Sequence, residues 1–404
     1  MRFSSRVDIS EPNPIAQADA RAASRGMALG RLNDSNPTRH GLGPAAIPGV
    51  YAAQPRGPLK AREALADFLG SRDMRGSQGG GDLESRGGPR RAVDPERLYL
   101  LSSTSQAYSW LFKLLCDADD IVLAPKPGYP LIESIARLEC VRTREYQLGF
   151  DGSWFIDAAA LKTLLNGPDG PRIRALVLIN PNNPTGSYIK PQERGAVVAL
   201  CRAHDVALIA DEVFFDYALE PFAGNARLAG ENGVVTFALD GFSKMLAAPH
   251  AKVGWIEVSG PKPDVDEALR RLDVIADDYL PMSDIIAERI PELLAAAPAQ
   301  TERVGSRVQG NLAALHAMLS RDPDGLVSVL RAEGGWNVLL RLPAVLDEND
   351  VVLAMIRDHR LSGQPGYFFD MTSNGYLALS LLPEPKEFTR NVRAMLDTVA
   401  GLLD

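Results

Sequence analysis

The sequence predicts an α/β fold in which a mostly parallel sheet is covered by helices on both faces. Apolar runs of strand length alternate with helix-like segments through the middle of the 404-residue chain. The expected strands are 97–101, 121–124, 175–179, 206–210, 234–238 and 253–257, and the expected helices include 106–115, 131–137 and 191–204. Apolar strands that alternate with helices are typical of a parallel sheet buried on both sides.

The pattern changes beyond about residue 281, which indicates a second, smaller α/β domain. An Ala- and Leu-rich helical pattern runs to residue 319 and is followed by a few strands and a final helix after Pro385. We expect residues 1–48 to pack with the small domain, residues 49–285 to form the large domain and residues 286–404 to form the small one. The Gly- and Arg-rich stretch 70–91 has no periodicity and is predicted to be an inserted loop.

The composition argues against nucleic acid or a membrane as the partner. The net charge is −8, and phosphate binding needs a concentrated basic face. No stretch approaches the roughly 18 uninterrupted apolar residues of a membrane span, and the chain starts without an apolar targeting segment. We therefore expect a cytoplasmic protein. Cys116, Cys140 and Cys201 are far apart and have no His at ligand spacing, so we expect reduced thiols and no metal site.

Polar residues follow the predicted strands, and open α/β sheets bind ligands at the carboxyl ends of their strands. Ser103, Thr104 and Ser105 lie between a strand and a helix, where unpaired backbone amides and the helix dipole favour an anion. An ordinary helix N-cap would use the same residues. Tyr129 lies in the rigid turn 125–130 and could stack on a flat ligand, although a tyrosine in such a turn can also serve packing alone.

Asn183, Asp211 and Lys244 carry the most specific chemistry. Asn183 lies in a loop with two Asn-Pro steps, which can aim an amide inward. Asp211 ends an apolar strand, where a carboxylate is costly to bury unless it meets a cation, but a helix cap or a structural ion pair would also explain it. Lys244 follows 33 positions later. Alone it would be a surface charge; with an acid upstream it could hold pyridoxal phosphate.

Taken in order, these segments resemble the fold-type I pyridoxal phosphate enzymes, specifically the class I/II aminotransferase superfamily. The resemblance extends from about residue 33 to the string Tyr-Leu-Ala-Leu-Ser at 376–380. It implies a fold-type I transferase architecture, with pyridoxal 5'-phosphate bound by the large domain, residues 49–285. It also implies a homodimer with shared active sites.

The resemblance implies a role for each candidate residue. Lys244 matches the lysine that forms the aldimine, a Schiff base, with the cofactor and then moves the substrate proton. Asp211 matches the acid on the pyridine nitrogen, Asn183 the amide on the phenolic oxygen, and Tyr129 the stacked ring. The residues matched to the cofactor's phosphate are Ser103, Thr104, Ser105, Ser243 and Lys252, together with Tyr51, which would reach the phosphate bound by the partner subunit.

The chain departs from the family pattern at several positions. Phe214 stands where a tyrosine usually bonds the phenolic oxygen, Gly241 where a phosphate-binding serine is common, and Lys252 where an arginine is usual. Ala378 stands where an arginine usually clamps the substrate's α-carboxylate, a charge-assisted bond worth roughly 1.5 to 3 kcal/mol. The candidates for substrate binding are Ser35, Arg39 and His40, although Arg39 could instead be an ordinary surface residue.

These features lead us to expect an aminotransferase that moves an amino group between an amino acid or amine and a 2-oxo acid. A pyridoxal phosphate lyase, decarboxylase or oxidase is the alternative, because the same cofactor permits all of these reactions. A third possibility is a non-catalytic regulator that kept the fold to sense a ligand. The sequence does not name the donor or the acceptor.

Overall fold

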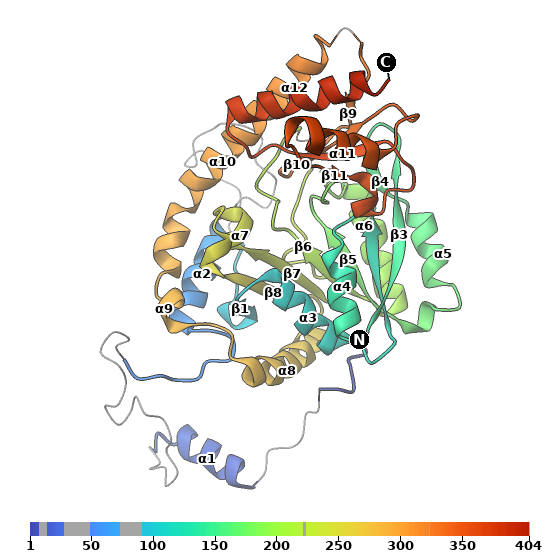
Figure 1. Cartoon of the computed structure of the whole chain (residues 1–404). Helices are drawn as coiled ribbons and strands as arrows, with labels where there is room; N and C mark the ends of the chain where they lie inside the picture. Colours follow the sequence, from blue (N-terminus) through green and yellow to red (C-terminus); the bar gives the residue numbers. More distant parts are fainter. Residues whose placement is uncertain (8–13, 28–48, 73–90, 221–223, 323, 404) are drawn as a thin grey trace.

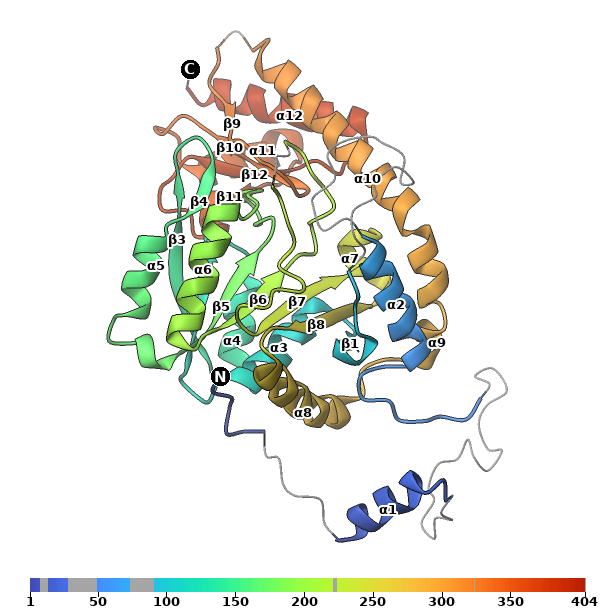
Figure 2. The same cartoon turned by 180° about the vertical axis from the view of Figure 1, so that it is seen from behind.

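The computed structural model describes residues 1–7, 14–27, 49–72, 91–220, 224–322 and 324–403. Most of these residues form two stacked domains (Figure 1). The large domain occupies the centre of the view, and the small domain, coloured orange to red, lies above it. Figure 2 shows the same stacking from behind. The expected fold class, a large helix-covered sheet with a smaller α/β domain, is confirmed.

The large domain contains an eight-stranded sheet within the described residues, in the order β1-β8-β7-β6-β5-β2-β3-β4. Strands β3, β2, β5, β6 and β7 are parallel neighbours, whereas β8 is antiparallel to both of its neighbours and β4 is antiparallel to β3. The strand bounds are β1 Leu98–Leu101, β2 Ile121–Lys126, β3 Arg142–Phe150, β4 Trp154–Ile156, β5 Ile173–Ile179, β6 Ala207–Asp211, β7 Thr236–Gly241 and β8 Gly254–Ser259.

Helices cover both faces of this sheet because its central strands are apolar on both sides. Val177 and Ile179 of β5 pack into one core cluster, and Leu176 and Leu178 pack into another. The first cluster contains residues from α3 (Thr104–Leu115), α4 (Leu131–Leu138) and α8 (Lys262–Tyr279). The second contains residues from α5 (Ala158–Leu165) and α6 (Pro191–His204). α2 (Leu59–Ser71) packs with β1 in a third cluster.

The small domain is built on an antiparallel sheet in the order β11-β12-β10-β9. Its strands are β9 Ser328–Val329, β10 Asn337–Arg341, β11 Gln364–Pro365 and β12 Tyr376–Ser380. Val338 and Leu340 of β10 and Leu377 of β12 pack in one core with residues of α11 (Glu348–His359) and α12 (Pro385–Gly401). The short helix η6 (Gly366–Phe369) precedes β12.

The long helix α10 (Ile290–Leu319) belongs to both domains. Leu294 and Ala297 pack in the cluster that contains α2, whereas Val304 and Val308 pack in the core of the small domain. The change from one core to the other therefore lies within α10, beyond the boundary that we expected at residues 285/286.

The large domain also contains the short helices α7 (Phe242–Met245) and α9 (Asp284–Ala287) and the 3-10 turns η3 (Pro95–Arg97), η4 (Gly170–Arg172) and η5 (Pro249–Ala251).

The start of the chain packs on the large domain. The backbone N–H of Ser4 donates to Leu114 O across 2.9 Å, and the terminal amino group of Met1 lies 2.9 Å from Asp264 Oδ1. The guanidinium group of Arg6 donates to carbonyls at the end of α3. The prediction that the N-terminal segment packs with the small domain is thus wrong for residues 1–7, whose backbone and charges find partners on α3 and α8.

The remainder of the N-terminal segment and the predicted loop are only partly described. Helix α1 (Pro14–Ser24) lies apart from both domains in the two views (Figures 1 and 2). The predicted loop at 70–91 begins inside α2, which ends at Ser71, and residues 73–90 lie outside the described residues. No helix in the described ranges is long and apolar enough to cross a bilayer.

Candidate active site

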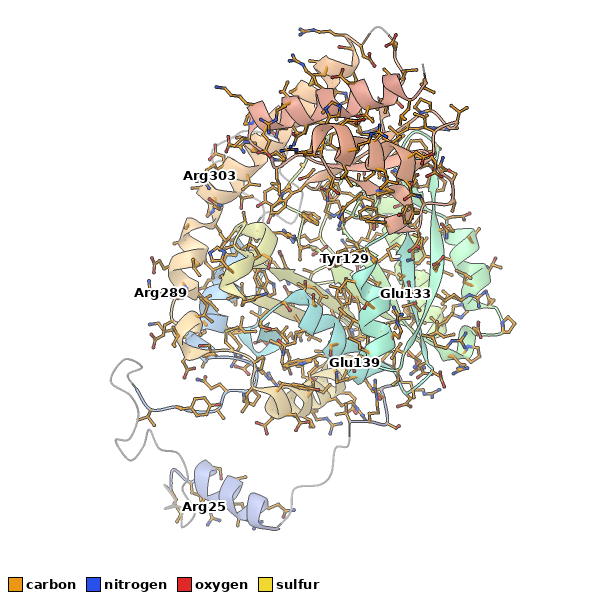
Figure 3. All side chains as sticks on the ribbon, viewed as in Figure 1. Arg25, Tyr129, Glu133, Glu139, Arg289 and Arg303 are labelled. Carbon is orange, nitrogen blue, oxygen red and sulfur yellow. The ribbon has the colours of Figure 1, made fainter. Side chains whose placement is uncertain are left out.

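Tyr129, Asn183, Asp211 and Lys244 lie at or just after the ends of four neighbouring strands of the large sheet, β2, β5, β6 and β7. Because β2, β5, β6 and β7 are parallel, their carboxyl ends meet at the same edge. This edge faces the small domain, since the backbone N–H of Gly128, after β2, donates to Phe369 O of η6 across 3.1 Å. Figure 3 shows the neighbouring Tyr129 at this boundary, above Glu133 of α4.

Asp211 is a buried carboxyl group at the end of β6, with 6% of its surface exposed. It accepts a hydrogen bond from the Tyr108 hydroxyl across 2.9 Å and a longer one, 3.3 Å, from the Val213 backbone N–H. Burial raises its pKa to about 6, although the Tyr108 bond opposes the shift. No lysine or arginine in the described part of the chain forms an ion pair with Asp211, so the structural ion-pair reading is not supported.

Lys244 lies in α7, directly after β7, the strand next to β6. Its Nζ atom is 5.4 Å from the ring centroid of Phe214 and 5.4 Å from that of Trp336. Burial lowers its pKa, and the negative charge of Asp211 partly offsets that shift. The Tyr217 hydroxyl donates to Lys244 O across 2.7 Å and fixes the backbone of α7. The lysine thus lies beside two aromatic rings, and a larger share of its amine is neutral than in an exposed lysine at the same pH.

Asn183 is half-buried in the loop after β5. Its Oδ1 accepts a hydrogen bond from Asn337 Nδ2 of β10 across 3.0 Å. The neighbouring Asn182 is used differently, because its Nδ2 donates to Pro127 O and to Thr185 Oγ1 and so ties this loop to the loop after β2. The loop therefore presents Asn183, and not Asn182, to the small domain.

The N-terminus of α3 has the capping bond that the N-cap interpretation predicts. Ser103 is the N-cap, since its Oγ accepts from the Gln106 backbone N–H across 3.2 Å. Gly254 of β8 lies against the same turn, because a Cβ atom there would be 3.0 Å from the Ser103 carbonyl carbon and 3.1 Å from Thr104 N. A Cβ atom at Gly241 would be 2.8 Å from Val253 O, so the serine usual at this position would require β8 to shift.

The other predicted cofactor residues are less enclosed. Tyr129 is 41% exposed, and burial together with the nearby charge of Asp211 raises its pKa. Ser243 is half-buried beside Lys244, and Lys252 is exposed two residues before Gly254. Tyr51 is 44% exposed. The substrate candidates Ser35, Arg39 and His40 lie outside the described residues.

Three contacting residues were missed by the sequence analysis. Tyr108 binds Asp211, Trp336 lies beside Lys244, and Asn337 binds Asn183. Tyr108 lies one helical turn after Thr104, so its position on the helix behind the predicted anion site was an available signal. Trp336 and Asn337 follow two glycines at 334 and 335, a pattern that indicates a turn but no particular partner.

The chain is similar to aminotransferases over most of its length. A model of the family described as aminotransferase class I and II matches residues 52–384. An alanine aminotransferase of Mycobacterium tuberculosis is 26% identical, with 96% of this chain and 89% of that protein covered. The fold is similar to that of an Escherichia coli aminotransferase, with a TM-score of 0.73 at 20% identity and 99% and 98% coverage. It is also similar to Treponema denticola cystalysin containing pyridoxal 5'-phosphate, with a TM-score of 0.72 at 14% identity and 88% and 85% coverage.

Proposed function

Because this chain belongs to the class I and II aminotransferase family, a family of pyridoxal phosphate enzymes, we propose that Lys244 and Asp211 are the centre of its catalytic site. The protein is an enzyme that transfers amino groups with pyridoxal phosphate as its cofactor. The family does not favour the lyase, decarboxylase or oxidase alternative, nor the non-catalytic regulator. The single observation that carries the site assignment is the Asp211 and Lys244 pair at the ends of neighbouring strands.

The charges of this pair fit the cofactor. Asp211 is buried, has a raised pKa and is paired with no cation among the described residues, so a protonated pyridine nitrogen would relieve its burial. Lys244 has a lowered pKa, and a neutral amine is the form that attacks a carbonyl group. When bound, pyridoxal phosphate supplies a ring that withdraws electrons from the carbon next to the substrate nitrogen.

The remaining candidates would hold the cofactor. Tyr108 and the Val213 N–H fix the Asp211 carboxylate, Asn183 would donate to the phenolic oxygen, and Tyr129 would stack on the ring. The phosphate would meet Ser103, Thr104, Ser105, Ser243 and Lys252 around the N-terminus of α3. Lys244 Nζ would carry the proton between the α-carbon of the substrate and the cofactor. The Phe214 and Trp336 rings lie 5.4 Å from this atom.

Spectral titration with pyridoxal phosphate tests the site. We expect the wild-type protein to take up the cofactor and gain an absorption band near the edge of the visible range. Lys244→Ala should abolish the band because it removes the nitrogen that bonds the cofactor. An amino donor should bleach the band of the wild type, and a 2-oxo acid should restore it. A wild-type protein that takes up no cofactor would refute the assignment of the site.

We also infer that the physiological donor and acceptor are an amino acid or amine and a 2-oxo acid, and that the enzyme works in the cytoplasm. The similarity to an alanine aminotransferase makes alanine with a 2-oxo acid the first pair to assay. Release of ammonia or carbon dioxide without recovery of the band by any 2-oxo acid would contradict transamination.

A homodimer with shared sites is the assembly that the surface supports. Large apolar side chains are exposed around α2, the end of α8 and α9, at fractions from 38% to 58%; they are Leu59, Tyr51, Tyr279, Leu280 and Ile285. α9 and α2 lie together, because Ile286 and Ala287 of α9 pack in the same cluster as residues of α2. The end of α8 is near them, because α9 begins a few residues after α8 ends. A second copy of this chain could cover this surface and bring Tyr51 to its phosphate site.

Sedimentation measurements on charged variants test the dimer. Ile285→Glu should shift the wild-type dimer toward a monomer, because a charge would be buried at the interface. Leu353→Glu on α11 is the matched control, since Leu353 is 61% exposed on the small domain and lies in none of the helices of the proposed interface. Equal sedimentation of the two variants and the wild type would exclude this surface as the interface.

A further inference from the structure

The amide of Asn183 is held by a residue of the other domain. Asn337 Nδ2 donates to Asn183 Oδ1 across 3.0 Å, although the two residues are 154 positions apart. Asn337 is the first residue of β10, and Asn183 lies in the loop after β5. The hydrogen bond therefore crosses from the small domain to the large domain, beside the proposed cofactor site.

This bond decides which end of the Asn183 amide is free. A carboxamide has an oxygen that accepts and an NH2 group that donates. Because Asn337 donates to the oxygen of Asn183, the NH2 group of Asn183 remains available to another acceptor. The residue before Asn337 borders the site as well, since the Trp336 ring centroid is 5.4 Å from Lys244 Nζ. The start of β10 thus touches both the amide and the lysine.

Among the described contacts, no side chain of the neighbouring strand β12 bonds Asn183, although Ser380, opposite Asn337, carries a hydroxyl group. Asn337 pairs with Ser380 and Leu339 pairs with Ala378, so these side chains share one face of the small sheet. At Ala378 that face carries only a methyl group. Among the residues that the structure describes, Asn337 is accordingly the side chain that bonds the oxygen of Asn183.

We propose that Asn337 is a positioning residue, which keeps the NH2 group of Asn183 turned toward the phenolic oxygen of the cofactor. This inference rests on the proposed function, because it presupposes that pyridoxal phosphate binds at Lys244. A negatively charged phenolic oxygen is stabilised by an N–H donor and repelled by an amide oxygen. The orientation of the Asn183 amide therefore determines whether it strengthens or weakens cofactor binding, and the small domain sets this orientation.

The nearly isosteric variant Asn337→Asp provides the test. An ionised aspartate can only accept, so Asn183 should turn its NH2 group toward it and present its oxygen to the cofactor. We expect the dissociation constant for pyridoxal phosphate, measured by spectral titration of the cofactor-free protein, to rise about 10- to 100-fold, as for loss of a charge-assisted bond. The apparent pKa of the bound chromophore should rise as well. Asn337→Ala lets Asn183 turn freely, so its dissociation constant should rise less, by under about tenfold.

A double-mutant cycle separates orientation of the amide from the new charge. In an Asn183→Ala background, Asn337→Asp should change the dissociation constant by under about threefold, because there is no amide left to turn. Equal effects of Asn337→Asp in both backgrounds would overturn the proposal, as would an unchanged dissociation constant and chromophore pKa in Asn337→Asp. If the wild-type protein itself bound no cofactor, the proposed function would fail, whereas normal binding by all the Asn337 variants would refute only the role of Asn337.

Discussion

Asp211 is a carboxyl group that folding makes harder to ionise, and this gives the cofactor-free protein a pH-dependent stability. Its pKa is raised from 3.8 to about 6 by burial. The folded state therefore binds more protons than the unfolded state between these values, and the free energy of unfolding should fall as the pH rises from about 4 to about 6. The shift corresponds to about 3 kcal/mol, at 1.36 kcal/mol per pKa unit.

Asp211→Asn tests this expectation because it removes the titration but keeps a polar partner for Tyr108. The cofactor-free variant should gain up to about 3 kcal/mol over the wild type between about pH 4 and pH 7, measured by urea unfolding at each pH. Other carboxyl groups, such as Glu212 and Asp216, titrate in both proteins. Their contribution therefore cancels when the unfolding free energy of the wild type is subtracted from that of the variant. A difference that stayed constant with pH would contradict a raised pKa at Asp211.

Single residues of the site were predictable where their signal is local. Asp211 and Lys244 each stand at the end of a strand that its own apolar run defines, so the sequence places them at one edge of a parallel sheet. The contacts of Tyr108 with Asp211 and of Asn337 with Asn183 join residues 103 and 154 positions apart. Such pairs depend on how helices and domains pack, which no pattern within a segment encodes.

The N-terminus of helix α3 has a cap that stabilises the helix, and it also lies at the proposed phosphate site. Its N-cap, Ser103, satisfies the Gln106 N–H and leaves the neighbouring amides of the first turn unpaired within the helix. Ser103→Ala should cost about 1 kcal/mol of unfolding free energy, as for other lost caps. The same substitution should also raise the dissociation constant for pyridoxal phosphate, because the serine borders the proposed phosphate site.

Asp157→Ala is the matched control for this prediction. Asp157 caps α5 by accepting from the Ala159 and Ala160 N–H groups, and α5 packs on the sheet face opposite to α3. We expect a similar loss of stability in urea unfolding, again about 1 kcal/mol, with an unchanged dissociation constant for the cofactor. If both variants raised the dissociation constant for the cofactor equally, the effect of Ser103 on cofactor binding would come from protein stability alone.

The elements themselves were predicted more completely than their grouping. Helix α6 has the expected bounds, Pro191–His204, because a proline starts it and a left-handed Asp205 ends it. The expected strands lie within a few residues of β1, β2 and β5 to β8. The domain boundary was misplaced because α10 is one continuous helix whose two halves pack on different cores, and its helical pattern does not change there.

At the scale of the whole molecule, a charged contact links the two domains. Lys126, at the end of β2, has a 5% exposed side chain and forms an ion pair with Asp370, which follows η6 of the small domain. Glu133 and Glu145 are more distant from its Nζ, at 3.8 and 3.9 Å. The Gly128 and Phe369 backbone bond lies beside this pair. No local sequence pattern predicts it, because the partners come from different domains.

Substitution of Asp370 tests whether its ion pair with Lys126 holds the two domains together. Asp370 has a φ of 56°, a left-handed conformation that asparagine adopts readily, so Asp370→Asn removes the charge and keeps the backbone. Since Asp370 is partly exposed, the expected loss of unfolding free energy is about 1 kcal/mol. KM for the amino donor should rise, because a contact that holds the small domain against the large one beside Lys244 is weakened. Glu133→Gln is the control, with a longer and more exposed contact and an expected change under about 0.5 kcal/mol. Urea unfolding and steady-state kinetics measure both quantities. Equal values for the two variants would mean that Lys126 is held by the large domain alone, and that its contact with Asp370 does not hold the domains together.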